Sequence, residues 1–214
     1  MLQTKAVKDD TLGLLKRLMQ DGRLNDFSLV GGTALALQIG HRQSIDIDLF
    51  SRADFDAPSL KEYLQNAYVF QETASGKNTL KGIIDGVAVD LITHNYAPVK
   101  ELVLQEEIRM AGLEDISAMK LNAIAGNGTR LKDFVDVAFL SSRFPLKKMR
   151  EWHGQKYALS NPLQAIIALN YFDDINFGIN YARGDFAWGS VKERIEAMIK
   201  CPTSVFPPLL PRKK

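Results

Sequence analysis

Two carboxylates stand two residues apart in the run Ser44-Ile45-Asp46-Ile47-Asp48-Leu49-Phe50. Residues two apart on a β-strand point to the same side, so Asp46 and Asp48 are expected to share one face while the apolar residues point into a core: Ile45, Ile47 and Leu49. Like charges side by side are unfavourable unless a cation joins them. Hard oxygen ligands suit Mg²⁺ or Mn²⁺, which also bind substrate phosphates. The pattern predicts a divalent metal site, with a solvated edge strand as the alternative.

A glycine turn precedes the two acids. Phe27-Ser28-Leu29-Val30 is typical of a short strand and runs into Gly31-Gly32, after which Thr33 is expected to cap a helix over residues 34–39 that ends at Gly40. Backbone N–H groups at a helix N-terminus, together with the helix dipole, favour an anion, and glycine lets a phosphate approach closely. The segment therefore predicts a phosphate site, and an ordinary tight turn is the alternative.

A third carboxylate lies on a predicted hairpin. Residues 79–84 and 87–92 are β-prone and are separated by Asp85-Gly86, a strong hairpin signal. Asp90 then shares its face with Ala88 and Ile92, and an acid in an apolar row needs a partner. That partner is a cation shared with the first two acids; the alternatives are a salt bridge or a position at a chain end.

These segments, taken in order, resemble the polymerase-beta-type nucleotidyltransferases, and specifically the AbiEii/AbiGii toxin family of abortive-infection and toxin-antitoxin systems. The resemblance extends over roughly residues 27–175. It is carried by the glycine turn with Thr33-Ala34-Leu35 and the acidic strand, and then by the following later segments: Gly86 to Ile92, Glu114 to Leu121, Lys132-Asp133-Phe134-Val135-Asp136, and Tyr171-Phe172-Asp173-Asp174.

The resemblance implies roles for most of these residues. Asp46, Asp48 and Asp90 would hold two Mg²⁺ or Mn²⁺ ions, and Asp90 would also help to deprotonate the attacking hydroxyl. The glycine turn would position the β- and γ-phosphates of an NTP. The remaining nucleotide-binding candidates are Gly31, Gly32, Thr33, Arg42, Ser44, Lys120, Lys132, Asp133 and Asp136. Arg42 is a phosphate contact on this view, while Ser44 is expected to bond the local backbone.

Lys120 lies on a predicted helix that Asp115 is expected to cap, beside an apolar stripe of Ile116, Met119, Ala123 and Ile124. A cation there suits a triphosphate, as the resemblance implies, and a surface lysine is the alternative.

Asp133 and Asp136 are three residues apart and share a helix face. They are expected to orient Lys120 or Arg130, or to serve a helix start. The pattern leaves open which of Arg130 and Lys132 points into the site.

Composition restricts the function classes. The chain has 214 residues, of which 46% are hydrophobic, enough for one sizeable core or two small ones. No run approaches a membrane span and the N-terminus lacks a signal-peptide pattern, so we expect a cytoplasmic protein without a membrane partner. Cys201 is the one cysteine, which excludes a disulfide framework and does not support zinc. The three histidines are scattered, and only His41, between the turn and Asp46, is a minor candidate for a direct role.

Charge is distributed unevenly. Residues 1–119 hold 12 lysines and arginines against 17 acids, whereas residues 120–214 hold 15 against 8. The second half could receive a nucleic-acid backbone. Its densest basic segment is Lys147, Lys148, Arg150, Trp152 and Lys156, for which an ordinary wet helix face is the slightly preferred interpretation.

The fold expected is α+β: a polymerase-beta-like core with a mixed sheet and flanking helices, followed by an α-helical half. Helices are predicted near residues 12–19, near 58–66, from 114 onward and over 191–199, and a further strand is predicted near 68–72. Leu12 is expected on the buried side of the first helix, and residues 165–172 are expected to be buried. The domains expected are 1–112, the nucleotidyltransferase core, 113–200, a helical domain completing the active-site cleft, and 201–214, a flexible tail.

The function expected is magnesium-dependent transfer of an NMP from an NTP to an acceptor, with RNA such as tRNA as the acceptor that the resemblance implies. It also implies a toxin role and a cognate antitoxin. The alternatives are a non-catalytic nucleotide-binding regulator and a transferase acting on a small molecule or a protein hydroxyl. The sequence does not indicate which NTP is used or the oligomeric state.

Overall fold

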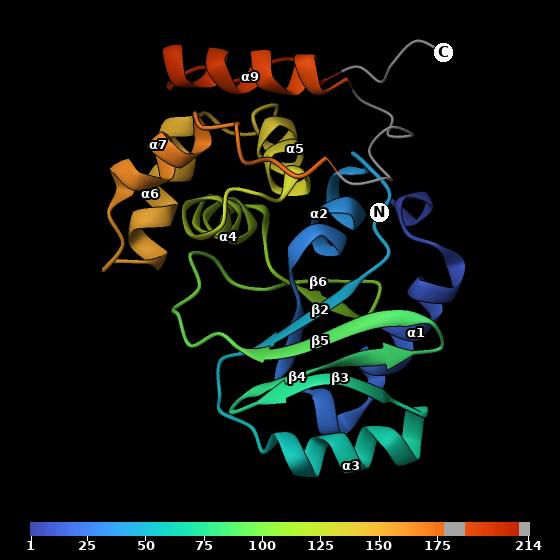
Figure 1. Cartoon of the computed structure of the whole chain (residues 1–214). Helices are drawn as coiled ribbons and strands as arrows, with labels where there is room; N and C mark the ends of the chain where they lie inside the picture. The colour runs from blue at the N-terminus through green and yellow to red at the C-terminus, as the bar shows by residue number, and fades with distance from the viewer. Residues whose placement is uncertain (178–186, 210–214) are drawn as a thin grey trace. The chain divides into compact units, whose positions relative to one another are not determined.

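The fold is given by a computed structural model, which describes residues 1–177 and 187–209 (Figure 1). The chain divides into two compact units, Met1–Gly112 and Leu113–Lys214, which we call the sheet unit and the helical unit. The fold is α+β, as predicted. Within the described ranges, no helix is both long and apolar enough to cross a membrane.

The sheet unit contains one mixed sheet of seven strands in the order β3-β4-β5-β2-β1-β7-β6. Strands β2 and β5 pair in parallel, as do β1 and β7, and the other neighbours are antiparallel. The strands are β1 (Phe27–Leu29), β2 (Ile47–Ser51), β3 (Gln71–Gly76), β4 (Thr79–Ile84), β5 (Val87–Thr93), β6 (Val103–Gln105) and β7 (Ile108–Met110), and the α-helices are α1 (Asp9–Gln20), α2 (Gly31–Ile39) and α3 (Ala57–Tyr68).

The two hairpins of the sheet differ in how visible they are in the sequence. The turn at Asp85-Gly86 forms as predicted, with both residues in the left-handed region (φ 51° and 77°). The hairpin of β6 and β7 was not predicted, because its turn uses Glu106 and Glu107 at φ 51° and 64°. Glutamates carry no hairpin signal, since such turns usually contain Gly, Asn or Asp.

One face of the sheet forms the core. Ile47 and Leu49 are buried on β2, and Val89 and Leu91 are buried beside them on β5. Ile45 is 45% exposed, so its predicted place in the core is wrong. The reason is that β2 begins only at Ile47, and the alternation of a strand does not hold before it starts.

Helices α1 and α3 also bury apolar faces, which for α3 are Leu60 and Leu64. On α1 the buried row includes Leu14, Leu15 and Leu18, while Leu12 is only half-buried, which corrects its predicted position. Strand β3 begins at Gln71 rather than near Tyr68, because α3 continues to Tyr68. Helix α1 packs near β7 and α3 packs on β3 and β4, while α2 contacts the acidic strand β2.

The described residues of the helical unit include α4 (Leu113–Gly126), α5 (Leu131–Leu140), α6 (Leu146–Lys156), α7 (Pro162–Leu169) and α9 (Trp188–Lys200) (Figure 1). Helix α4 packs against α5, α6 and α7, and α9 packs on α5. Phe134 of α5 and Phe172 both contact the ring of Trp188, with centroids 6.2 and 5.5 Å away. Ile167 is 71% exposed, so the predicted burial of residues 165–172 holds only in part.

Residues 201–209 follow α9 without regular structure. Pro202 accepts a hydrogen bond from the Lys147 N–H at 2.8 Å, and the Phe206 N–H donates to the Ser141 carbonyl at 2.9 Å. These bonds connect the segment to the start of α6 and the end of α5. Residues 210–214, the last part of the predicted flexible tail, lie outside the described residues.

Candidate active site

The acidic strand places two carboxylates next to each other. Asp48 on β2 and Asp90 on β5 are register partners on neighbouring parallel strands. Their strands are spaced about 4.8 Å apart and their side chains leave the sheet on the same side. Both are half-buried, on the face opposite the core residues Ile47 and Val89. Asp46, also half-buried, precedes the first residue of β2.

The glycine turn lies against Asp48. Gly31 has a φ of +70°, and a Cβ at this position would collide with a carboxylate oxygen of Asp48. A Cβ at Gly32 would collide with the guanidinium of Arg42. Gly31 is required by its positive φ, whereas at Gly32 the contact is with the far end of the Arg42 side chain, which can shift. At Gly31 the turn is therefore more specialised than an ordinary tight turn. The fold thus places two of the predicted site residues, Asp48 and Arg42, against the glycine turn.

Helix α2 begins at Gly31, three residues before the predicted start, and Val30 occupies the N-cap position. Thr33 is consequently not the cap, because it already lies inside the first turn. In the part of the chain that the structure describes, no side chain caps this N-terminus. The first-turn N–H groups and the positive end of the helix dipole thus adjoin the Asp48 carboxylate. Gly40 ends the helix in the left-handed region, as predicted.

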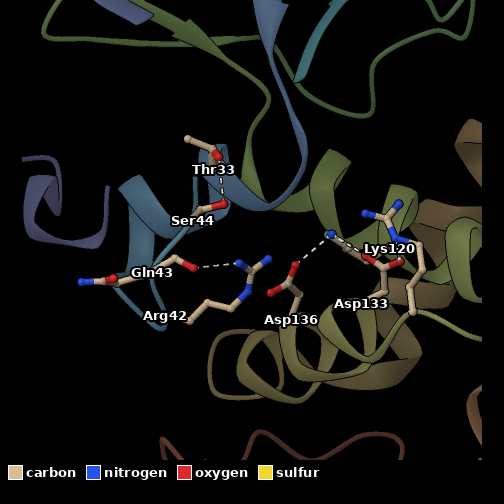
Figure 2. Close-up of polar contacts among 8 residues, drawn as sticks. Thr33, Arg42, Gln43, Ser44, Lys120, Asp133 and Asp136 are labelled. Carbon is tan, nitrogen blue, oxygen red and sulfur yellow. Dashed lines mark hydrogen bonds and ion pairs between the residues drawn. The ribbon is translucent and has the colours of Figure 1, made fainter. Parts of the chain in front are cut away.

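Thr33 is almost fully buried and is used structurally. Its hydroxyl donates to the Asp46 carbonyl, and its oxygen is 2.9 Å from the hydroxyl of Ser44 (Figure 2). Because a hydroxyl has one proton, Ser44 is the donor in the second bond. The two residues connect α2 to the segment that leads into Asp46, so the structure gives them a positioning contact. Arg42 donates from Nη1 to the Gln43 carbonyl at 3.0 Å.

Asp90 has a partner that the sequence analysis did not identify. Lys81 is its register partner across the β4–β5 hairpin, and the ammonium forms an ion pair with Oδ2 of Asp90. This is the salt bridge left open above. The two-residue turn at Asp85-Gly86 would have revealed it, because that turn fixes residue 81 opposite residue 90.

The carboxylates fit a divalent cation in their chemistry and in their shared face. Asp48 and Asp90 are adjacent hard oxygen donors, and Asp48 lies in a cradle that any Cβ at Gly31 would fill. Across the described ranges 1–177 and 187–209, however, no group of three or more potential ligands is already gathered as a metal site. Asp90 instead holds Lys81. A cation is thus compatible with the residues and requires side-chain rearrangement.

In the helical unit, Lys120 forms a buried ionic cluster with two acids of α5. Its ammonium is 2.6 Å from Oδ1 of Asp133 and 2.8 Å from Oδ2 of Asp136 (Figure 2). All three residues are buried. Burial by itself lowers the pKa of Lys120, but the charges of Asp136 and Asp133 outweigh it and raise the pKa above its ordinary value. Lys120 is therefore a fixed cation and not the surface lysine of the alternative interpretation.

The surroundings of this cluster distinguish the two basic residues left open. Nε of Arg130 is 3.8 Å from Oδ2 of Asp133, an atom that is buried and without a hydrogen-bond partner among the described residues. Lys132 is exposed. The contact with Asp133 therefore places Arg130 beside the Lys120 cluster, although its side chain, like that of Lys132, is exposed.

Asp115 was predicted to cap α4, and this is wrong. Helix α4 begins at Leu113, so Asp115 lies in its first turn, where it is buried and forms an ion pair of 2.8 Å with Lys156 of α6. In the predicted basic segment of α6, three of the five residues are buried, paired or packed and so do not form a free basic surface. Lys156 is buried, Lys148 pairs with Glu151, and the ring of Trp152 packs edge-on against Phe144 with centroids 4.7 Å apart.

A cavity of about 390 Å³ lies in the sheet unit, at the start of α3 and the turn between β3 and β4. It is lined by Phe55, Asp56, Ala57, Pro58, Lys61, Ser75, Gly76, Lys77 and Asn78. None of the predicted site residues lines it.

Comparison with known proteins relates the chain to nucleotidyltransferases. A protein of Aquifex aeolicus (strain VF5), described as uncharacterized, is 29% identical over 202 residues, which are 92% of this chain and 97% of that protein. A crystal structure of a putative nucleotidyltransferase from H. pylori matches with a TM-score of 0.54 at 16% identity, covering 91% of this chain and 95% of that one.

A second solved structure is an antigenic nucleotidyltransferase-like protein from Paracoccidioides brasiliensis, with a TM-score of 0.50 at 16% identity over 94% of this chain and 98% of that one. At such identities these structures establish the fold. The family model described as nucleotidyl transferase AbiEii toxin, type IV TA system, matches residues 13–175. Since this match covers more than half of the sequence, the chain belongs to the AbiEii nucleotidyl transferase toxin family.

Proposed function

We propose that the chain transfers an NMP from an NTP to an acceptor hydroxyl in a reaction that depends on Mg²⁺ or Mn²⁺. The observation that carries the proposal is the junction of Asp48, Asp90 and Gly31. Two register-paired carboxylates lie on one face, and one of them lies against the uncapped N-terminus of α2. A cation site and an anion site that adjoin in this way are suited to a metal-bound triphosphate.

The reaction breaks one bond and forms one. The acceptor oxygen attacks the α-phosphorus, the bond from that phosphorus to the bridging oxygen of the β-phosphate breaks, and pyrophosphate leaves. Asp46, Asp48 and Asp90 would hold the divalent cation, which when bound supplies Lewis-acid stabilisation of charge on the phosphates. The first-turn N–H groups of α2 would bind the leaving phosphates, with Arg42 as a further phosphate contact. Asp90 would receive the hydroxyl proton, directly or through water.

The residues proposed to bind nucleotide in the helical unit are supported by the contacts they make within that unit. Asp133 and Asp136 hold the Lys120 ammonium in a fixed place, so Lys120 would offer a phosphate a positioned N–H donor without losing side-chain entropy on binding. Lys132, which is exposed, is retained as a nucleotide contact with less support than Arg130. Thr33 and Ser44 act by fixing the segment that leads into Asp46.

RNA, in particular tRNA, is the proposed acceptor, and the toxin role and a cognate antitoxin are proposed with it. Membership of a toxin family supports the toxin role. The excess of basic residues beyond residue 119 is compatible with a polyanionic acceptor. A small-molecule or protein hydroxyl is the second acceptor class, and a cytoplasmic location is proposed because the substrates are found there.

The test is incubation of the purified protein with each α-labelled NTP, Mg²⁺ and total RNA. We expect label on a discrete RNA band. Asp48→Asn should reduce transfer by a factor of 10³ or more, because it removes a charged ligand while preserving the shape of the side chain. Asp26→Asn, an exposed aspartate just before β1, is the control for loss of one negative charge.

Transfer by Asp48→Asn at the wild-type rate would refute the assignment of the site. Label on small molecules or on protein, with none on RNA, would move the acceptor to the second class. Absence of label from every acceptor, with intact nucleotide binding, would favour the non-catalytic regulator.

A further inference from the structure

Lys81 completes a row of three charged side chains across the sheet. Lys81 on β4, Asp90 on β5 and Asp48 on β2 are consecutive register partners, so all three leave the same face. The order of charges across the strands is one positive followed by two negative. On the side of Asp48 away from Asp90, its carboxylate lies against the glycine turn at Gly31. The acidic pair therefore has an internal cation at one end and the N-terminus of α2 at the other.

The position of this lysine has an electrostatic consequence. Two carboxylates on adjacent strands repel each other in the absence of a cation, and the Lys81 ammonium relieves that repulsion by pairing with Asp90. The pair is partly solvated, since the side chain of Lys81 is 39% exposed and that of Asp90 is 27% exposed. A pair of this kind holds its partners only weakly, by about fivefold or less in an equilibrium constant. A divalent cation is able to displace it.

We propose that Lys81 is an internal competitor of the divalent cation: it occupies Asp90 in the metal-free protein and must leave Oδ2 before Asp90 can bind metal. Lys81 is on this view a positioning residue that acts through Asp90 and weakens metal binding in the absence of nucleotide. The inference rests on the proposed function, because it takes Asp48 and Asp90 as the metal ligands.

The size of the effect follows from two contributions. Removing the ammonium abolishes the competing ion pair, and it also removes a positive charge one strand away from the proposed ligand Asp90. In a partly solvated site these contributions together amount to about five- to tenfold in affinity. Lys81→Met removes the charge and keeps most of the aliphatic chain.

The test measures Mn²⁺ affinity without nucleotide, from the EPR signal of free Mn²⁺ at constant pH and low salt. We expect Lys81→Met to bind Mn²⁺ about five- to tenfold more tightly than wild type, and Lys81→Arg to restore the wild-type affinity. Lys77→Met is the matched control, because Lys77 is an exposed lysine in the turn that precedes β4. In an Asp90→Asn background, Lys81→Met should have no further effect, since the shared ligand is absent.

Equal or weaker binding by Lys81→Met would overturn the inference, as would the same gain in Lys77→Met. This failure is distinguishable from failure of the proposed function. If Asp48→Asn abolishes transfer while Lys81→Met leaves Mn²⁺ affinity unchanged, only the inference falls. If Lys81→Met binds Mn²⁺ more tightly but no acceptor is labelled, only the proposed transfer falls. No Mn²⁺ binding by any of these proteins without nucleotide would overturn the inference, and the labelling assay with NTP would still decide the proposed transfer.

Discussion

Removing the Lys120 ammonium should destabilise the helical unit strongly. Lys120→Met leaves Asp133 and Asp136, both buried, without the cation that contacts them at 2.6 and 2.8 Å. Breaking a buried ion pair from one side costs about 3–5 kcal/mol, because a buried charge is left uncompensated. This is a large part of the total stability of an ordinary domain, about 5–15 kcal/mol.

The chain provides a matched control and a specific probe. Lys148 and Glu151 form a pair with the same 2.6 Å separation as Lys120 and Asp133, but their side chains are 56% and 45% exposed. Lys148→Met should therefore cost less than about 0.5 kcal/mol. Both tryptophans of the chain, Trp152 and Trp188, belong to the helical unit, so tryptophan fluorescence during urea unfolding reports on the unit that contains Lys120.

Changing the two acids as well should recover much of the loss. The triple variant Lys120→Met/Asp133→Asn/Asp136→Asn buries no charge at these positions, and it is expected to be more stable than Lys120→Met alone. If Lys120→Met lowered the free energy of unfolding by less than about 1 kcal/mol, as little as Lys148→Met, the reasoning from burial would be refuted.

The pH dependence has a definite sign. The pKa of Lys120 is raised in the folded protein: burial opposes the shift, and the charges of Asp136 and Asp133 outweigh it. Its stabilising contribution is therefore fully present below the ordinary lysine value of 10.5 and is lost as the pH rises through the higher folded pKa. The difference in stability between wild type and Lys120→Met should be constant from pH 7 to pH 10 and should shrink at higher pH.

Two further predictions concern single positions. Gly31→Ala should lower the free energy of unfolding by about 1–2 kcal/mol, because φ is +70° and the new Cβ meets Asp48. Gly13→Ala, in an open part of α1, should raise it by about 0.5–1 kcal/mol. Urea unfolding followed by circular dichroism should show these opposite changes, and changes of the same sign would contradict this account. His153 is buried, and neither ring nitrogen is hydrogen-bonded among the described residues. Burial lowers the pKa of His153, so the folded protein favours the neutral imidazole. This contribution to stability is lost as the pH falls below about 6.5, where the histidine of the unfolded chain becomes protonated. His153→Leu should flatten the decline in unfolding free energy between pH 6.5 and 5, and an unchanged decline would show that another group causes it.

The sequence by itself determined the local features of this protein. Alternation around Asp48 and the β-prone residues around Asp90 placed both on strands, the Asp85-Gly86 pair determined the hairpin between β4 and β5, and Gly40 marked the end of α2. Each of these depends on the preferences of a few neighbouring residues, which a sequence displays directly. The order of the motifs was sufficient to identify the family, and the family match confirms it.

Only the tertiary structure decided which charges meet. It paired Asp115 with Lys156, and of the two predicted partners of Asp133 and Asp136 it buried Lys120 between both acids. Such pairs depend on register and helix packing, so a lysine that will be buried has the same local sequence signal as one that remains in water. Asp115 and Lys156 are 41 residues apart, and no local pattern indicated their pairing. The partners within reach of local patterns were accessible from the sequence: the hairpin register places Lys81 opposite Asp90, and Lys120 was one of the two predicted partners of Asp133 and Asp136.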